Sequence, residues 1–325
     1  MLRRRAIAYF ALLTAVFIWG LNFVIVKKGI DAWNDQTFLF LAARFWVAVI
    51  VYRLIMSLKS KSPPKEEWNR NKRWKAALVG IILAGGYGLQ TRYLAADRNS
   101  AVGAAFLTST TVLWAPFLAR LAFKQRVLAA TWAGAILAMT GIVLMEVPVS
   151  IHSAKWTLVG VAAAICFAVE ILLVSKYAPT DKFESLRWTM VSCFAVAAIM
   201  TILAVIRGNW SWSNGWIRVF AVLFTGTVAT ALALFLQNWA QAQEVDHTKI
   251  IDAPRVAIIA ALEPVFTTLA VGILLLFGMQ VSISPLKVLP TVGCFFILLG
   301  TLISEIAAAK HAQKQTSQGD SPAAG

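Results

Sequence analysis

The chain has 325 residues, of which 59% are hydrophobic and 14% are charged, and its mean hydropathy is +0.71. A soluble globular protein carries roughly 25% charged residues, so this chain lacks the polar surface that a soluble fold needs. The composition predicts an integral membrane protein and excludes a disordered chain, a disulfide scaffold and a soluble nucleic-acid-binding domain.

A helix needs about 20 mostly apolar residues to cross a bilayer. The sequence contains ten such stretches, at residues 7–26, 36–58, 74–96, 101–119, 127–145, 157–175, 188–206, 216–243, 256–281 and 285–304. We therefore predict an all-α membrane protein with ten transmembrane helices. The tail at 307–325 is rich in Gln, Ser, Gly and Ala, which favours a disordered cytoplasmic segment.

The net charge of +15 follows from this topology. Most Lys and Arg residues of the connections fall on one side of the ten spans, beginning with Arg3, Arg4 and Arg5. Basic connections stay in the cytoplasm, so we expect both termini there and no nucleic-acid partner.

Polar, proline and glycine residues recur in the same order in the two halves of the chain. Because each half holds five spans, an odd number, the second half must enter the membrane in the opposite sense. We predict two inverted five-helix repeats, at residues 1–150 and 151–306, with a substrate cavity between them. The matched pairs are Asn22 with Glu170, Arg44 with Arg187, Gln90 with Gln237, Pro116 with Pro264, Gly134 with Gly293, and Gly141 with Gly300.

Ionisable side chains are costly in lipid, so those inside spans are functional candidates. Glu170 could bind a proton or a substrate amine, or form a structural pair with another helix. Glu263 precedes Pro264, and we expect it to serve backbone groups freed by the proline rather than to carry protons. Arg44 and Arg187 are expected to form structural ion pairs, or to meet Glu170, Glu263 or a substrate carboxylate.

Two amide-bearing stripes predict walls of a transport pathway. Tyr87, Gln90 and Thr91 share one helical face of the third span, and Gln237 and Gln241 share one face of the eighth. Lipid cannot satisfy amide groups, which favours a pathway, although hydrogen bonding between helices is the alternative.

Two tryptophans inside spans lie next to polar residues in the sequence. Trp19 is close to Asn22, and Trp114 is close to Thr111. An aromatic wall beside polar groups suits an amphipathic, aromatic or cationic substrate, with core packing as the alternative.

Small residues and prolines predict packing and bending of particular spans. Glycines spaced seven apart let helices approach closely, so the fifth and tenth spans are expected to pack against each other or form a dimer contact. Prolines inside spans predict kinks that could flex during transport. The residues concerned are Gly134, Gly141, Gly293 and Gly300 for packing, and Pro116 and Pro264 for kinks.

Several motifs occur together in one order: Phe-Ile-Trp-Gly-Leu-Asn-Phe at 17–23, Ala-Ala-Arg-Phe at 42–45, Leu-Glu-Pro-Val-Phe at 262–266, and the two Gly-x6-Gly pairs. In these the chain resembles the drug/metabolite transporter superfamily, in its ten-helix EamA-like branch, over residues 7–306. The resemblance implies export of small metabolites, often amino acids or amphipathic compounds, across the bacterial inner membrane without ATP. The chain departs from the family after the fourth and ninth spans, where an acidic residue is often found and residues 123–125 and 278–280 hold none.

We therefore predict a secondary active exporter of amino-acid-like or amphipathic metabolites, with proton coupling through Glu170 as an option. The expected partners are a small-molecule substrate and the lipid bilayer, with no metal or other cofactor, in a monomer or homodimer. One alternative is an exchanger of phosphorylated or nucleotide-linked sugars, which would need Arg44, Arg92 and Arg187 to face the cavity. A receptor or intramembrane enzyme is disfavoured, because no Ser/His/Asp, Cys/His or metal-binding pattern occurs.

Overall fold

The computed structural model describes residues 2–33, 36–58, 68–96, 101–146, 154–208, 215–245, 248–276 and 288–319. The first half contains α1 (Leu2–Ala32), α2 (Thr37–Leu58), α3 (Arg70–Ala95), α4 (Ala101–Ser109), α5 (Thr111–Leu121) and α6 (Ala129–Glu146). The second half contains α7 (Ala154–Tyr177), α8 (Lys182–Arg207), α9 (Trp216–Phe224), the π-helix η1 (Thr225–Leu232), α10 (Ala233–Ala242), the strands β1 (Glu244–Val245) and β2 (Thr248–Lys249), α11 (Ala253–Ala260), α12 (Glu263–Leu276) and α13 (Val288–Gly319).

Helix ends coincide with residues that cap helices. Asn69 accepts a hydrogen bond from the backbone N–H of Lys72 at the start of α3, and Asp181 accepts two at the start of α8. Gly208 ends α8 with φ 66°, a left-handed conformation that glycine adopts without steric cost. Asp252 caps α11, whose first turn contains a proline.

Eight helical stretches within the described residues are long and apolar enough to cross a membrane. They cover the predicted first, second, fourth and sixth to tenth spans, while the apolar helix Ala129–Met145 in the fifth is shorter. Helix α3 occupies the predicted third span, but its polar residues lower its hydropathy. An all-α membrane protein is thereby confirmed, whereas the count of ten spans stays a prediction.

The outer surface of the bundle is apolar. Exposed large hydrophobic residues occur on helices of both halves, including Phe10, Ile81, Leu158, Phe220 and Phe295. An apolar surface of this extent on many helices is the surface that lipid covers.

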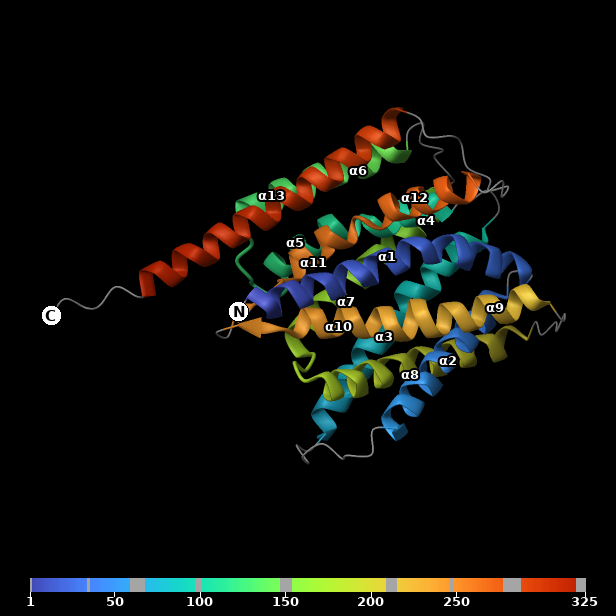
Figure 1. Cartoon of the computed structure of the whole chain (residues 1–325). Coiled ribbons are helices and arrows are strands. Elements are labelled where there is room, and N and C mark those ends of the chain that lie inside the picture. Colours follow the sequence, from blue (N-terminus) through green and yellow to red (C-terminus); the bar gives the residue numbers. More distant parts are fainter. Residues whose placement is uncertain are drawn as a thin grey trace.

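Helix pairings in one half have counterparts in the other. Helix α6 packs along α13, and α2 packs on α8 (Figure 1). Helix α3 packs on α7 and α8, and the corresponding segments η1 and α10 pack on α1, with η1 also on α2. Helix α1 packs on α12, as α7 packs on α5. If each helix of the first half is replaced by its counterpart in the second half, most of the helix–helix contacts stay the same.

Three predicted spans differ in detail from the structure. The fourth is interrupted at Thr110, and the ninth is interrupted at Ala261 and Leu262. The eighth is one continuous helical stretch that contains a π-helical segment. The ends of the last two predicted spans, residues 277–281 and 285–287, lie outside the described residues.

The predicted disorder of the C-terminal tail is wrong for residues 307–319. Helix α13 continues to Gly319 and extends past the rest of the bundle at one end (Figure 1). The physical reason is that Ala, Lys and Gln in this segment are good helix formers, so a helix already nucleated in the membrane propagates through them. Residues 320–325 lie outside the described part of the chain.

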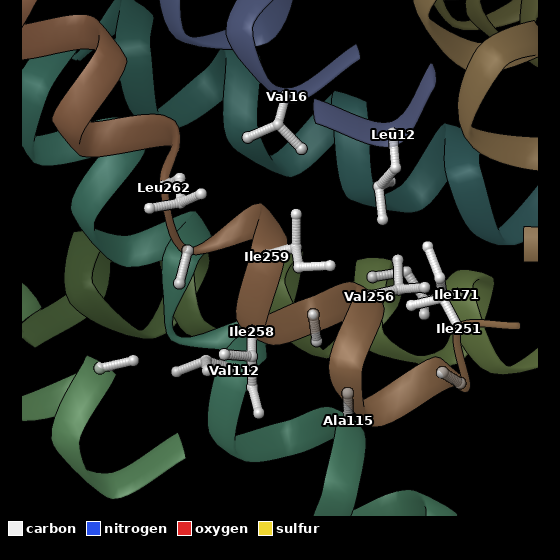
Figure 2. Close-up of a cluster of buried hydrophobic side chains, with 14 of the residues drawn as sticks. Leu12, Val16, Val112, Ala115, Ile171, Ile251, Val256, Ile258, Ile259 and Leu262 are labelled. Carbon is white, nitrogen blue, oxygen red and sulfur yellow. The ribbon is translucent and has the colours of Figure 1, made fainter. Parts of the chain in front are cut away.

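The largest buried cluster lies where the two halves meet. Leu12 and Val16 of α1 face Ile259 and Leu262 of the interrupted ninth span, and Val112 of α5 joins them from the interrupted fourth (Figure 2). The two interruptions therefore lie inside the molecule, next to α1 and α7.

Candidate functional site

A central cavity opens beside this cluster. It has a volume of about 70 Å³, enough for a few water molecules. Both interrupted spans contribute walls, together with α1, α3, α7 and α10. Its lining residues are Leu12, Trp19, Asn22, Phe23, Leu83, Tyr87, Gln90, Thr108, Ser109, Thr111, Phe167, Glu170, Ile171, Leu234, Gln237, Val256, Ala257, Ala260, Ala261 and Glu263.

Six of the predicted pathway residues line this cavity: Trp19, Asn22, Tyr87, Gln90, Thr111 and Gln237. Both predicted acids, Glu170 and Glu263, line it as well. Residues from six different helical segments are thus brought to one place.

Three predicted pathway residues do not line the cavity. Thr91 and Gln241 are buried away from it, and both amide atoms of Gln241 lack a hydrogen-bond partner among the described residues. Trp114 packs against the large apolar cluster and makes an edge contact with Phe117. A helical stripe spans more of the helix circumference than one narrow cavity can reach, which is why only part of each stripe is on the wall.

Glu170 and Gln237 form a buried acid–amide pair across the cavity. The Gln237 amide nitrogen lies 3.2 and 3.4 Å from the two carboxylate oxygens of Glu170. Glu170 is 2% exposed. The sequence left two roles open for Glu170, a structural pair with another helix and the binding of a proton or amine. The structure contains the hydrogen bond to a neighbouring helix, and it also leaves the carboxylate on the cavity wall.

Glu263 lies at the start of α12, directly after the interruption of the ninth span. The backbone N–H of Leu262 bonds to Ile259 three residues back, at 3.1 Å, so the α-helical pattern is broken there. Pro264 is the second residue of α12, where its missing N–H is tolerated. The expected kink is therefore a full break between two helices.

The expected backbone role of the Glu263 side chain is wrong among the residues that the structure describes. Its carboxylate makes no hydrogen bond to any of them and lines the cavity instead. The hydroxyl of Thr267 donates to the Glu263 carbonyl at 2.9 Å, so a threonine one turn later serves this part of the backbone.

The fourth span breaks at Thr110 and not at its proline. The N–H of Thr110 bonds to Leu107 at 3.2 Å, and its hydroxyl donates to the same carbonyl at 2.7 Å. The Thr111 hydroxyl donates to Ala164 of α7 at 3.1 Å. Pro116 lies inside the continuous helix α5. Threonine hydroxyls competing for backbone carbonyls explain the position of the break.

Tyr87 and Gln90 of α3 are held in place on the cavity wall. Tyr87 makes edge contacts with Phe45 and Phe167, with ring centroids 5.1 and 5.3 Å apart. The Gln90 amide donates to the Thr108 hydroxyl at 2.9 Å. These side chains form an aromatic and amide surface that is fixed by its own neighbours.

Arg44 does not meet a carboxylate among the described residues. Its Nε donates to the Thr230 hydroxyl at 2.6 Å, and its guanidinium lies 5.0 Å from the Tyr87 ring centroid. Arg44 is 1% exposed and is absent from the cavity lining. Neither the expected ion pair with Glu170 nor the one with Glu263 forms, because Tyr87 occupies the cavity side of this arginine.

Arg187 takes a different position from its predicted counterpart. It lies near the start of α8, partly exposed, with its guanidinium 4.6 Å from the Phe183 ring centroid. The matched arginines of the two halves are therefore not equivalent in space, and no described carboxylate is paired with Arg187.

The π-helix η1 was not predicted from the sequence. Three successive residues of it receive side-chain donors: Ala229 from Trp19 at 2.9 Å, Thr230 from Arg44, and Ala231 from Tyr52 at 2.6 Å. The acceptors are the backbone carbonyls of Ala229 and Ala231 and the side-chain hydroxyl of Thr230, so neighbouring helices supply donors to this segment. Residues 225–232 hold three threonines and one glycine, but the prediction placed them within one regular helix.

The four predicted packing glycines lie between α6 and α13. An ideal Cβ on Gly134 would come within 2.6 Å of the Gly300 carbonyl oxygen, and one on Gly141 would overlap the Gly293 carbonyl oxygen. These glycines bring the two backbones into direct contact, away from the cavity.

A second polar cluster at the end of the bundle where α1 begins joins α1, α11 and α13. Arg255 is 3.0 Å from Asp252 and 3.2 Å from Glu305, and the Tyr9 hydroxyl donates to the Glu305 carboxylate. Arg255 also donates to the carbonyl of Ile250 at 2.8 Å. Arg255 is thus a buried, ion-paired residue that ties the three helices together.

The described lining of the cavity contains two acids and no lysine or arginine. The sugar-phosphate exchanger required Arg44, Arg92 and Arg187 to face the cavity, and none of them lines it. The chemistry of the walls is aromatic, amide and acidic.

Comparison with known proteins finds sequences and a fold that are similar to this chain. Residues 6–147 match the EamA-like transporter family. An uncharacterized transporter of Archaeoglobus fulgidus is 27% identical over 301 residues, covering 92% of this chain and 86% of the relative. A protein of known crystal structure has the same fold, with a TM-score of 0.72 at 17% identity over 93% of this chain and 97% of that chain. These similarities support the resemblance to the drug/metabolite transporter superfamily that the sequence motifs indicated, and they support a membrane transporter.

Proposed function

We propose that the chain is a secondary active exporter of small amino-acid-like or amphipathic metabolites in the cell inner membrane. Transport proceeds by alternating access between two inverted five-helix repeats, residues 1–150 and 151–306, with both termini in the cytoplasm. The observation that carries this proposal is the central cavity, whose walls come from both halves and include both interrupted spans.

Interrupted helices at the repeat interface are the usual construction of a substrate site in secondary transporters. The exchange of helix neighbours between the halves supports an inverted repeat. The fixed contact of α6 with α13 leaves the remaining helices of each half to move around the cavity.

The size of the cavity supports alternating access. Pockets for small molecules usually measure roughly 300–1,000 Å³, whereas this one measures about 70 Å³. A metabolite would therefore fit only after the walls separate, as alternating access requires.

Glu170 is the proposed proton carrier. It is buried in the membrane interior, bonded only to the neutral Gln237 amide among the described residues, and it faces the cavity. An acid so placed can bind a proton from either side once the cavity opens to that side.

The test is flux in proteoliposomes with a panel of labelled amino acids and amphipathic compounds, with and without an imposed pH gradient. We expect the gradient to drive transport and Glu170→Gln to abolish the gradient-dependent part. Glu184→Gln is the matched control, because that acid pairs with Lys72 at 3.2 Å outside the cavity. If the transport rate is the same with and without the pH gradient, proton coupling is refuted. If none of the compounds is transported, the proposed substrate class is refuted.

A further inference from the structure

We propose that the central cavity is built to bind an organic ammonium group, with amines preferred over the corresponding amino acids. This inference rests on the proposed transport function, since it names the chemistry of the substrate in the same cavity. It is carried by the arrangement of acceptor groups on the cavity wall.

The two acids of the cavity have no positive partner in the described part of the chain. Glu170 is 2% and Glu263 is 8% exposed, and neither takes part in a salt bridge. The nearby guanidinium of Arg44 lies behind Tyr87, bonded to Thr230. Two buried carboxylates without a cation are costly unless a positive group binds between them or they are protonated.

A further buried acceptor lines the same cavity as Glu263. Asn22 of α1 contributes to the cavity wall. Asn22 is 7% exposed, and its side-chain oxygen has no hydrogen-bond partner among the described residues.

The break after α11 leaves one backbone carbonyl of a cavity-lining residue without its usual α-helical donor. Ala260 and Ala261 line the cavity, and Pro264 has no N–H to donate to the carbonyl of Ala260. An ammonium group carries three N–H donors and no acceptor, which matches a wall of carboxylate, amide and carbonyl oxygens.

The aromatic residues of the cavity fit the same ligand. The indole N–H of Trp19 donates to the Ala229 carbonyl, so its ring is held at the wall. Tyr87 is fixed between Phe45 and Phe167. Ring faces attract cations, and the apolar side chains around them would hold the hydrocarbon part of the ligand.

A ligand with a carboxylate fits less well. In the described lining an amino acid would place its own negative charge near two acids and no lysine or arginine. Like charges in a low-dielectric interior repel strongly, so removing the carboxylate should strengthen binding.

The experiment compares equilibrium binding of labelled phenylethylamine and phenylalanine to the full-length protein in nanodiscs, without a gradient. We expect phenylethylamine to bind at least roughly tenfold more tightly than phenylalanine, and Glu263→Gln to weaken amine binding roughly tenfold or more. Glu244→Gln is the control, since this acid pairs with Lys249 on the β-hairpin. Asn22→Leu provides a second variant that leaves both acids in place and should also weaken amine binding.

Equal binding of the two compounds, or amine binding unchanged by Glu263→Gln and Asn22→Leu in well-folded protein, would overturn the proposal. Sodium or potassium ions that bind at these residues while the amine does not would also overturn it. Because the assay measures binding alone, amine binding without any flux would refute the proposed transport and leave the ammonium site standing.

Discussion

The contact between α6 and α13 makes a sharp prediction about Gly141. An ideal Cβ at this position would overlap the carbonyl oxygen of Gly293 and lie 2.8 Å from both Cγ1 and the backbone N of Ile297. Two of these three atoms belong to the backbone and cannot rotate away. Gly141→Ala should therefore push the two helices apart.

The magnitude follows from two opposing effects. Alanine is favoured over glycine inside a helix by about 1 kcal/mol. Overpacking a tight contact costs about 1–3 kcal/mol, and here the upper part of that range applies because backbone atoms must move. We expect a net loss of about 1–2 kcal/mol in the free energy of unfolding.

Gly272 of α12 is the matched control. No described atom lies within 4 Å of an ideal Cβ there, so Gly272→Ala gains only the helix preference. We expect it to stabilise the protein by about 0.5–1 kcal/mol. Reversible unfolding of both variants in mixed micelles measures the difference, and the reasoning fails if Gly141→Ala proves as stable as Gly272→Ala.

Two further substitutions test the polar contacts that hold the bundle. Tyr52→Phe removes the donor to the Ala231 carbonyl of η1, a buried group with a 2.6 Å hydrogen bond, and should lower the unfolding free energy by about 1–2 kcal/mol in the same assay; an unchanged stability would show that this carbonyl needs no partner. Glu305→Gln removes the negative charge that pairs with Arg255, and the Glu305 carboxylate is partly exposed. We expect the free energy of unfolding to fall by about 1 kcal/mol at low salt and by less at high salt. A loss of stability that does not depend on salt would contradict an electrostatic role.

The fold class was predictable because lipid imposes a simple rule on the sequence. Long apolar segments must be helices, and the residues that interrupt their apolar character are few enough to be noticed one by one. Glu170 and Gln237 were identified in this way, and they meet on the cavity wall. The packing glycines could be identified from the sequence because only glycine lets two helix backbones touch directly.

The details that depend on partners from other helices were not predictable. A buried arginine suggests an ion pair, but Arg44 takes a hydroxyl and an aromatic ring because those groups lie within its reach. Pro116 suggested a kink, yet the helix breaks at Thr110, where hydroxyls compete for carbonyls. The positions of Thr91 and Trp114 depend on the rotation of each helix in the bundle, which a single sequence does not fix.

The π-helix has a consequence for how the eighth span tolerates changes in length. Each residue of an i to i+5 helix turns through a smaller angle than a residue of an α-helix, so η1 sets the rotational phase between α9 and α10. Removing one residue from this segment would let it rewind to α-helical bonding while Gln237 keeps its orientation toward Glu170. A deletion in the middle of a membrane helix usually misorients the residues that follow it. In the eighth span, a one-residue deletion within η1 is expected to be tolerated.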